Sequence, residues 1–142
     1  MGRRKAREIA MKLLYQYDIT GELSAQPLEE MPDVLDTETL KEENRAYLDN
    51  VIRAFPDKRE EIDGIISEFS HSWKIERIGK VDLAILRLAL FEILFVENIP
   101  EKVSVNEAVE MAKEYSTDKS HKYINGLLGG YLRSRKALQP EG

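Results

Sequence analysis

The segment at residues 81–96 limits the fold of this chain more than any other. It reads VDLAILRLALFEILFV, with thirteen apolar residues among sixteen and no glycine or proline. A helix that is hydrophobic on all sides is buried, either in a protein core or in a membrane. At about 24 Å, and with charges at Asp82, Arg87 and Glu92, this helix is too short and too polar to cross a bilayer. We therefore predict a central core helix, whereas a buried strand of this length would be unusual.

Most other segments show the apolar spacing of helices that cover such a core. These segments are residues 3–19, 36–55, 57–69, 105–115 and 117–135, with a short helix expected within 24–36 and a helical turn at 75–78. Pro56 is expected to end one helix and Asp36 to cap another. Ser104 and Glu107 match a capping box at the start of a third. No segment alternates like a β-strand, so we expect one all-α domain, residues 1–142, with about seven helices.

The sequence offers little material for catalysis or metal binding. It contains no cysteine and only two histidines, and it has no His-Glu-x-x-His motif, no P-loop and no dinucleotide-binding glycine motif. We therefore expect no enzymatic activity, no catalytic residues, no bound metal and no cofactor. No signal peptide is recognisable, and the lack of cysteine fits a reducing compartment, so we expect a cytoplasmic protein that does not enter a membrane.

Basic residues are concentrated in two places, although the formal net charge of the chain is −5. The first group, at the start of the first predicted helix, consists of Arg3, Arg4, Lys5 and Arg7. Cations at a helix N-terminus oppose the helix dipole, so a polyanionic ligand would explain them better than stability does. Arg3 and Arg7 are expected to share an outer face, while Arg4 can pair with Glu8. Solubility is the simpler alternative explanation for this group.

The second basic group lies at the start of the last predicted helix. Its members are Lys119, His121, Lys122, Tyr123 and Asn125. There a phosphate would meet lysine charge and the free N–H groups of the helix N-terminus, beside an aromatic ring and an amide. Proteins bind single-stranded RNA through such combinations of stacking and hydrogen bonds. The other interpretation is that Tyr123 packs in the core.

Three blocks of the sequence, taken in order, carry a family resemblance. The first block is RRKARE at residues 3–8, followed by Leu14-Tyr15, and the second is residues 73–96, with VDLAILRLALFE at 81–92. The third joins VNEAVEMAK at 105–113 to SHKYING at 120–126. Together these blocks resemble the NusB family of transcription antitermination factors, over nearly the whole chain except about residues 21–45.

This resemblance implies a fold and a set of partners. Family members consist of two small helical bundles, here expected at about residues 1–70 and 71–136, and they have no enzymatic activity. They pair with the ribosomal protein NusE, and the pair binds the boxA element of RNA. That complex helps RNA polymerase to pass terminators during ribosomal RNA synthesis. The resemblance leaves open whether this chain is a monomer or a homodimer.

The resemblance also implies roles for individual residues. The RNA-facing set would consist of Arg3, Arg4, Lys5, Arg7, Lys122, Tyr123 and Asn125. The NusE-facing set would be Tyr15, Glu76 and Asp82, although Asp82 would also be favoured simply by the dipole at the start of its helix. Lys119 departs from the family, whose members often have an acid there. We add Lys119 to the RNA-facing set, because a cation should strengthen the attraction of phosphates.

Two other functions fit the same residues. A helical protein-interaction module would use the basic groups only for solubility and would not bind RNA. A related helical domain also occurs fused to ribosomal RNA cytosine methyltransferases. An accessory domain in ribosomal RNA modification, without RNA specificity of its own, is therefore the second alternative.

Overall fold

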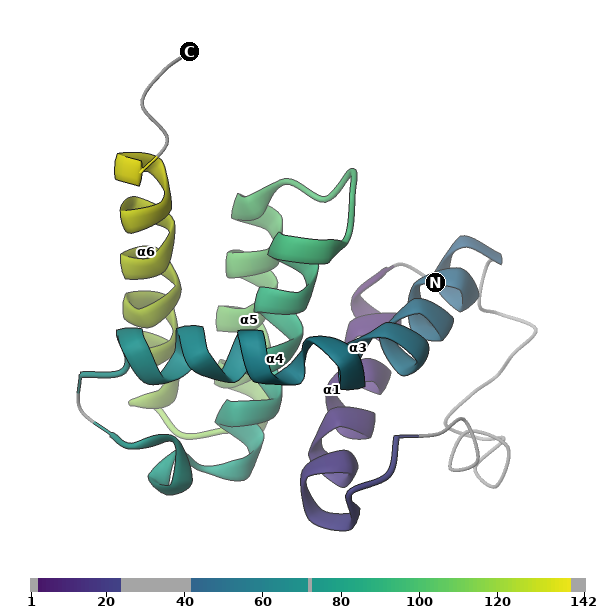
Figure 1. Ribbon diagram of the computed structural model, residues 1–142. Coiled ribbons are helices and arrows are strands. Elements are labelled where there is room, and N and C mark those ends of the chain that lie inside the picture. The colour runs from purple at the N-terminus through teal and green to yellow at the C-terminus, as the bar shows by residue number, and fades with distance from the viewer. Residues whose placement is uncertain (1–2, 24–41, 72, 139–142) are drawn as a thin grey trace.

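The computed structural model describes residues 3–23, 42–71 and 73–138, and every regular element in these residues is helical (Figure 1). The elements are α1 (Arg3–Thr20), α3 (Glu42–Phe69), the 3₁₀ turn η1 (Ile75–Arg77), α4 (Lys80–Phe95), α5 (Glu101–Tyr115) and α6 (Ser120–Leu138). The all-α prediction is confirmed, but the number of about seven helices is not matched by the five α-helices of the described residues. The short helix expected at 24–36 and the cap at Asp36 lie outside these residues.

The predicted central helix is α4, and its burial is confirmed. Every residue from Leu83 to Ile93 is buried, including the charged Arg87 and Glu92. α4 packs against α1, α3, α5 and α6, and the apolar side chains of all five helices join in one core. None of the described helices is long and apolar enough to cross a membrane. The division into two sub-bundles near residue 70 stays a prediction.

α1 is amphipathic, as its spacing predicts. Its apolar buried face consists of Ala6, Ile9, Ala10, Met11, Leu13 and Leu14. The helix is followed by Gly21, whose φ of +79° is the left-handed conformation that glycine adopts without steric cost. The N–H of Gly21 donates to the carbonyl of Tyr17 at 2.8 Å, which satisfies one of the last carbonyls of the helix.

α3 continues through Pro56 as one helix of 28 residues, so the break expected there is wrong. Proline has no N–H to donate to the carbonyl of Ile52, and inside a helix it costs about 3 kcal/mol. Pro56 itself is exposed, while Phe55 and Ile62 on either side are fully buried. Packing of this apolar face holds the helix together across the proline. As a result α3 packs on α1, α4 and α6 (Figure 1).

α5 begins at Glu101, directly after Pro100, which is about one turn earlier than predicted. Ser104 therefore lies within the helix, and the predicted capping box of Ser104 and Glu107 is wrong. The buried Ser104 hydroxyl donates instead to Glu92 at 3.0 Å. Glu107 pairs with Arg4 of α1, at 3.0 Å between Oε2 and Nε. Partners that are distant in sequence have replaced the local cap.

Glu92 is the most buried charge of α4 and accepts hydrogen bonds from three other helices. Its carboxylate accepts Nε of Arg7 at 2.8 Å, the hydroxyl of Tyr47 at 2.5 Å and the hydroxyl of Ser104. Burial disfavours the Arg7 cation, but the hydrogen bond and the charge of Glu92 outweigh it and raise the pKa of Arg7, which stays charged. The described residues leave no buried side-chain nitrogen or oxygen without a hydrogen-bond partner.

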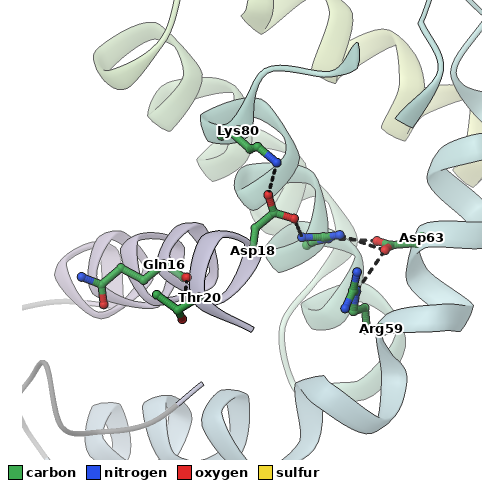
Figure 2. A network of polar contacts seen from close by, with 7 residues as sticks. Gln16, Asp18, Thr20, Arg59, Asp63 and Lys80 are labelled. Carbon is green, nitrogen blue, oxygen red and sulfur yellow. Dashed lines mark hydrogen bonds and ion pairs between the residues drawn. The ribbon is translucent and has the colours of Figure 1, made fainter. Parts of the chain in front are cut away.

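Arg87 forms a second polar junction, between α4, α1 and α3. Its guanidinium donates to Asp18 at 2.9 Å and, through two nitrogens, to Asp63 at 2.9 Å each. Figure 2 shows that Asp18 also meets Lys80 and that Asp63 also meets Arg59. Burial alone would raise the pKa of Asp18, but the hydrogen bonds from Lys80 and Arg87 lower it below its usual value. Both buried charges of α4 therefore have oppositely charged partners on other helices.

We expect Asp18→Asn to destabilise the chain at neutral pH and to matter less in acid. Because folding lowers the pKa of Asp18 from its ordinary value of 3.8, the carboxylate stabilises the fold above that value. This contribution is lost as the pH falls through the lower pKa of the folded state. Urea unfolding at about pH 7, 5 and 3 should give a constant difference between wild type and variant at the first two values and a smaller one at the third. An equal difference at all three would contradict the ion-pair role.

Candidate nucleic-acid interface

The start of α6 is tied to the start of α4 by one carboxylate. Asp82 accepts hydrogen bonds from the hydroxyls of Ser116 and Ser120, at 2.6 and 2.8 Å, one at each oxygen. The N–H of Ser120 donates to the carbonyl of Thr117 at 3.0 Å and closes the turn between α5 and α6. The side chains of this turn and of the first turns of α6 are therefore held in fixed directions.

A surface hollow of about 230 Å³ lies over this junction. Its lining includes Trp73, Arg77, Asp82, Lys119 and Tyr123. Both oxygens of Asp82 are engaged by serine hydroxyls, whereas Arg77 and Lys119 are exposed. Within the described part of the chain, neither of these two cations forms an ion pair. The hollow therefore presents two exposed positive charges and one hydrogen-bonded carboxylate beside aromatic rings, and its net positive charge suits a phosphate next to a base.

Tyr123 forms part of the wall of this hollow and is half-buried. Ser70 gives its single hydroxyl proton to the carbonyl of Trp73 at 2.6 Å, so the Tyr123 hydroxyl is the donor in its 2.5 Å contact with Ser70. Burial raises the pKa of Tyr123 and outweighs the opposing effect of Ser70, which keeps the phenol protonated. The ring of Tyr123 packs against the core and also lines the hollow, so core packing does not remove it from the surface, and its contact with RNA stays a prediction.

Lys119, Lys122 and Asn125 are exposed around the start of α6. Neither lysine has an ion-pair partner among the described residues. Lys122 and Asn125 are three residues apart, which places them on one helix face. The structure thus gathers the members of the second basic group at one accessible helix end, as their position in the sequence predicts.

Arg7 is only 4% exposed and is bonded to Glu92, so the prediction that it shares an outer face with Arg3 is wrong. The helical spacing of α1 places Arg7 beside the apolar stripe, and its partner lies 85 residues away in sequence. A buried, paired guanidinium cannot contact RNA directly. Its role is to join α1 to α4.

The other three residues of the N-terminal basic group are accessible to different extents. Arg3 is half-buried, lies 4.6 Å from the centre of the Tyr47 ring and donates to Asn44 at 2.8 Å. Arg4 is exposed but pairs with Glu107 of α5, not with Glu8 as expected. Lys5 is half-buried. Much of the charge of this group is therefore already engaged within the protein.

The two basic groups are separated along the direction of the α1 axis. α1 and α5 run side by side, since Arg4 pairs with Glu107 while Lys12 lies 5.2 Å from the centre of the Tyr115 ring. Tyr115 ends α5, shortly before Lys119 and α6. Eight residues of helix separate Arg4 from Lys12, which is about 12 Å along α1. The groups are therefore two patches rather than one.

The predicted partner-facing residues occupy three different settings. Tyr15 is half-buried on α1 and packs against the core. Glu76 is exposed on η1 and lines a second hollow, whereas Asp82 lines the first one. α4 is preceded by Gly79 without a side-chain cap, so Asp82 acts on the helix dipole only through its charge. Its hydrogen bonds to Ser116 and Ser120 are a further role, which the sequence did not reveal.

Sequence reasoning missed three residues of the hollow and its surroundings: Ser70, Trp73 and Arg77. All three lie between α3 and α4, in a segment that carries few periodic signals. The one usable signal was Trp73, the single tryptophan of the chain, placed among polar residues directly after a helix. Its neighbours in space come from α6, about fifty residues further along.

Comparison with known proteins agrees with the resemblance seen in the sequence. A family model described as the NusB family matches residues 4–133. A relative from Clostridium botulinum, named transcription antitermination protein NusB, is 46% identical over 138 residues, which is 91% of this chain and 98% of the relative.

Solved structures agree with the sequence comparison. NusB from T. maritima gives a TM-score of 0.73 at 32% identity and covers 91% of this chain and 89% of its own. A chain from the crystal structure of the antitermination factors NusB and NusE in complex with double-stranded RNA gives 0.76 at 28% identity, covering 93% and 96%. With a family model matched over most of its length and a curated relative nearly half identical to it, this chain belongs to the NusB family of transcription antitermination factors.

Proposed function

We propose that this chain binds RNA together with the ribosomal protein NusE, and that the pair recognises boxA RNA to support processive transcription of ribosomal RNA by RNA polymerase. The observation that carries the proposal is the start of α6, where Lys119 and Tyr123 line a hollow and the exposed Lys122 follows on the same turn, neither lysine having an ion-pair partner among the described residues. A relative crystallised with NusE and double-stranded RNA supports both kinds of partner. Cytoplasmic location follows from this function.

The RNA-facing set is narrower than the sequence suggested. Lys119, Lys122, Tyr123 and Asn125 form its centre, because they are accessible and no acid of the described residues neutralises the lysines. Arg3, Arg4 and Lys5 form a secondary patch at the start of α1, about 12 Å along this helix from Lys12, which lies beside Tyr115 at the end of α5. A longer strand would reach this patch. Arg7 is left out, because it is buried against Glu92.

The predicted NusE-facing set contains two acids, Glu76 and Asp82. Glu76 is the better placed of the two for binding NusE, because it is exposed. Asp82 would act mainly by fixing the turn that carries Ser116 and Ser120, since both its oxygens are already occupied. Tyr15 can offer only the accessible part of its ring, because the rest packs against the core. NusE binding is therefore expected to depend on Glu76 more than on Asp82.

A salt series with single-stranded RNA tests the proposal. For single strands, the logarithm of affinity falls with the logarithm of salt by about 0.7 per phosphate contacted. Lys119→Ala/Lys122→Ala should therefore make the slope shallower by about 1.4, and should weaken binding to boxA RNA and to a scrambled strand alike. The titration is carried out with and without NusE, using labelled RNA and fluorescence anisotropy.

The matched control is Lys102→Ala/Lys136→Ala, which removes the same charge from two exposed lysines at the opposite end of α6 and the start of α5. This variant should keep the wild-type slope. Equal slopes for the two double variants would remove the start of α6 from the RNA site. No binding at low salt, with or without NusE, would leave only the protein-interaction function.

A further inference from the structure

Trp73 is unusually accessible for a tryptophan. It is 53% exposed, and among the described residues only Ile19 and Val103 are other large hydrophobic side chains that are exposed. Its ring therefore remains largely outside the apolar core that the five helices share. An exposed aromatic side chain next to cations is a common feature of sites that bind single-stranded nucleic acid.

The backbone of Trp73 and the ring of Tyr123 are held by the same hydroxyl group. Ser70 donates to the carbonyl of Trp73 and accepts from the hydroxyl of Tyr123. These two contacts connect the segment after α3 to α6 across 53 residues of sequence. The two aromatic residues are thus fixed relative to each other, although they belong to different elements.

Trp73 is shared by two neighbouring hollows. One, of about 230 Å³, is the hollow with Arg77, Lys119 and Tyr123. The other, of about 340 Å³, is lined by Ser70, His71, Lys74 and Glu76 among others. The tryptophan ring is therefore accessible from two sides, with space beside it on each.

The charges around Trp73 favour an anionic partner over a neutral or basic one. Lys74, Arg77 and Lys119 are exposed cations, and none of them is paired within the described residues. Glu76 is the one exposed acid among the residues that line the two hollows, while Asp82 is occupied by two serine hydroxyls. Three cations against the two carboxylates of Glu76 and Asp82 leave the surroundings of the ring with a net positive charge.

We propose that Trp73 and Tyr123 form a two-ring platform on which bases of single-stranded RNA stack, while Arg77 and Lys119 hold the phosphates between them. This inference rests on the proposed RNA-binding function and extends its site beyond the residues that the family resemblance implied. Ser70 holds the backbone of Trp73 and the hydroxyl of Tyr123. The platform is indifferent to base identity, since every base has a face that can stack.

Because Trp73 is the single tryptophan, its fluorescence reports on the platform directly. Titration of the full chain with a short single-stranded RNA should quench this emission, saturating at the RNA concentration at which anisotropy of labelled RNA also saturates. Trp73→Ala should weaken binding about 5- to 150-fold with an unchanged salt slope, because a stacking surface and no charge is lost. Trp73→Phe should retain most of the affinity, since it keeps an aromatic ring.

Two controls accompany this experiment. Ile19→Ala removes a side chain that is 59% exposed at the end of α1, and it should leave RNA affinity unchanged. Duplex RNA of equal length, whose bases are stacked inside the helix, should bind through phosphates with much less quenching.

The outcomes separate this inference from the proposed function. If RNA binds with a slope that depends on Lys119 and Lys122, but emission is unchanged and Trp73→Ala has wild-type affinity, the platform is overturned and the function stands. If Trp73→Ala loses affinity only for NusE, the ring belongs to a protein interface and the platform is again overturned. If no RNA binds, the function fails and the platform fails with it.

Discussion

Arg7→Met is expected to lower the free energy of unfolding by about 3–5 kcal/mol, because it leaves the buried carboxylate of Glu92 without its cation. Methionine keeps most of the length and apolar volume of the arginine stem, so the loss comes from the charge rather than from a cavity. Glu92 is 1% exposed and cannot recover solvation from water. Denaturant unfolding followed by far-ultraviolet circular dichroism measures the change.

Two further variants show whether the pair itself is responsible. Arg7→Met/Glu92→Gln should lose less stability than Arg7→Met alone, because the amide oxygen can accept from one of the Tyr47 and Ser104 hydroxyls, the amide N–H can donate to the other, and no buried charge remains. Arg4→Ala, which breaks an exposed ion pair three residues earlier on α1, should leave the unfolding midpoint nearly unchanged. If Arg7→Met were as mild as Arg4→Ala, the buried junction would not hold the helices together.

Leu86→Ala is expected to cost about 2–5 kcal/mol, the range for removing a fully enclosed leucine side chain. Leu86 is 0% exposed and lies in the middle of α4, where four other helices meet. The cost has two parts, the lost transfer of apolar atoms from water and the cavity that the surrounding side chains fail to fill. Ile19→Ala, at an exposed site on α1, should have little effect in the same urea titration. Equal losses for the two variants would mean that α4 is not the centre of the core.

The parts of the fold that could be predicted from sequence are those in which local pattern and tertiary burial agree. The burial of α4 followed from its composition, since thirteen apolar residues among sixteen leave no polar face that could be exposed to solvent. The inner face of α1 and its bounds, to within one residue, followed from helical spacing. In these places the nearest neighbours in sequence decide the structure.

The failures share one physical cause, which is a partner distant in sequence. Pro56 should end a helix by local rules, but burial of Phe55 and Ile62 outweighs its cost. Ser104 was predicted to cap a helix, but its hydroxyl donates to Glu92, which is twelve residues away in sequence. Arg7 was predicted to be a surface cation, but its guanidinium donates to the same carboxylate, which is 85 residues away in sequence.

The candidate site shows the same division. Lys119, Lys122 and Tyr123 could be found from sequence because they are close together at one helix end. Trp73 and Ser70 could not be assigned to the site, because only the packing of α3 against α6 brings them to Tyr123. Arg77 was missed for a similar reason, since it reaches the hollow from the 3₁₀ turn η1.

Mapping of backbone amide shifts by NMR shows whether RNA binds at the start of α6 and beside Trp73. An isotope-labelled sample of the full chain is titrated with a single-stranded boxA RNA at low salt. We expect shifts at residues 119–125, at Arg77 and at the indole N–H of Trp73, with weaker shifts at residues 3–5 and with Arg7 unaffected. Shifts confined to other surfaces, such as the acidic part of α3 at residues 57–68, would exclude this RNA site.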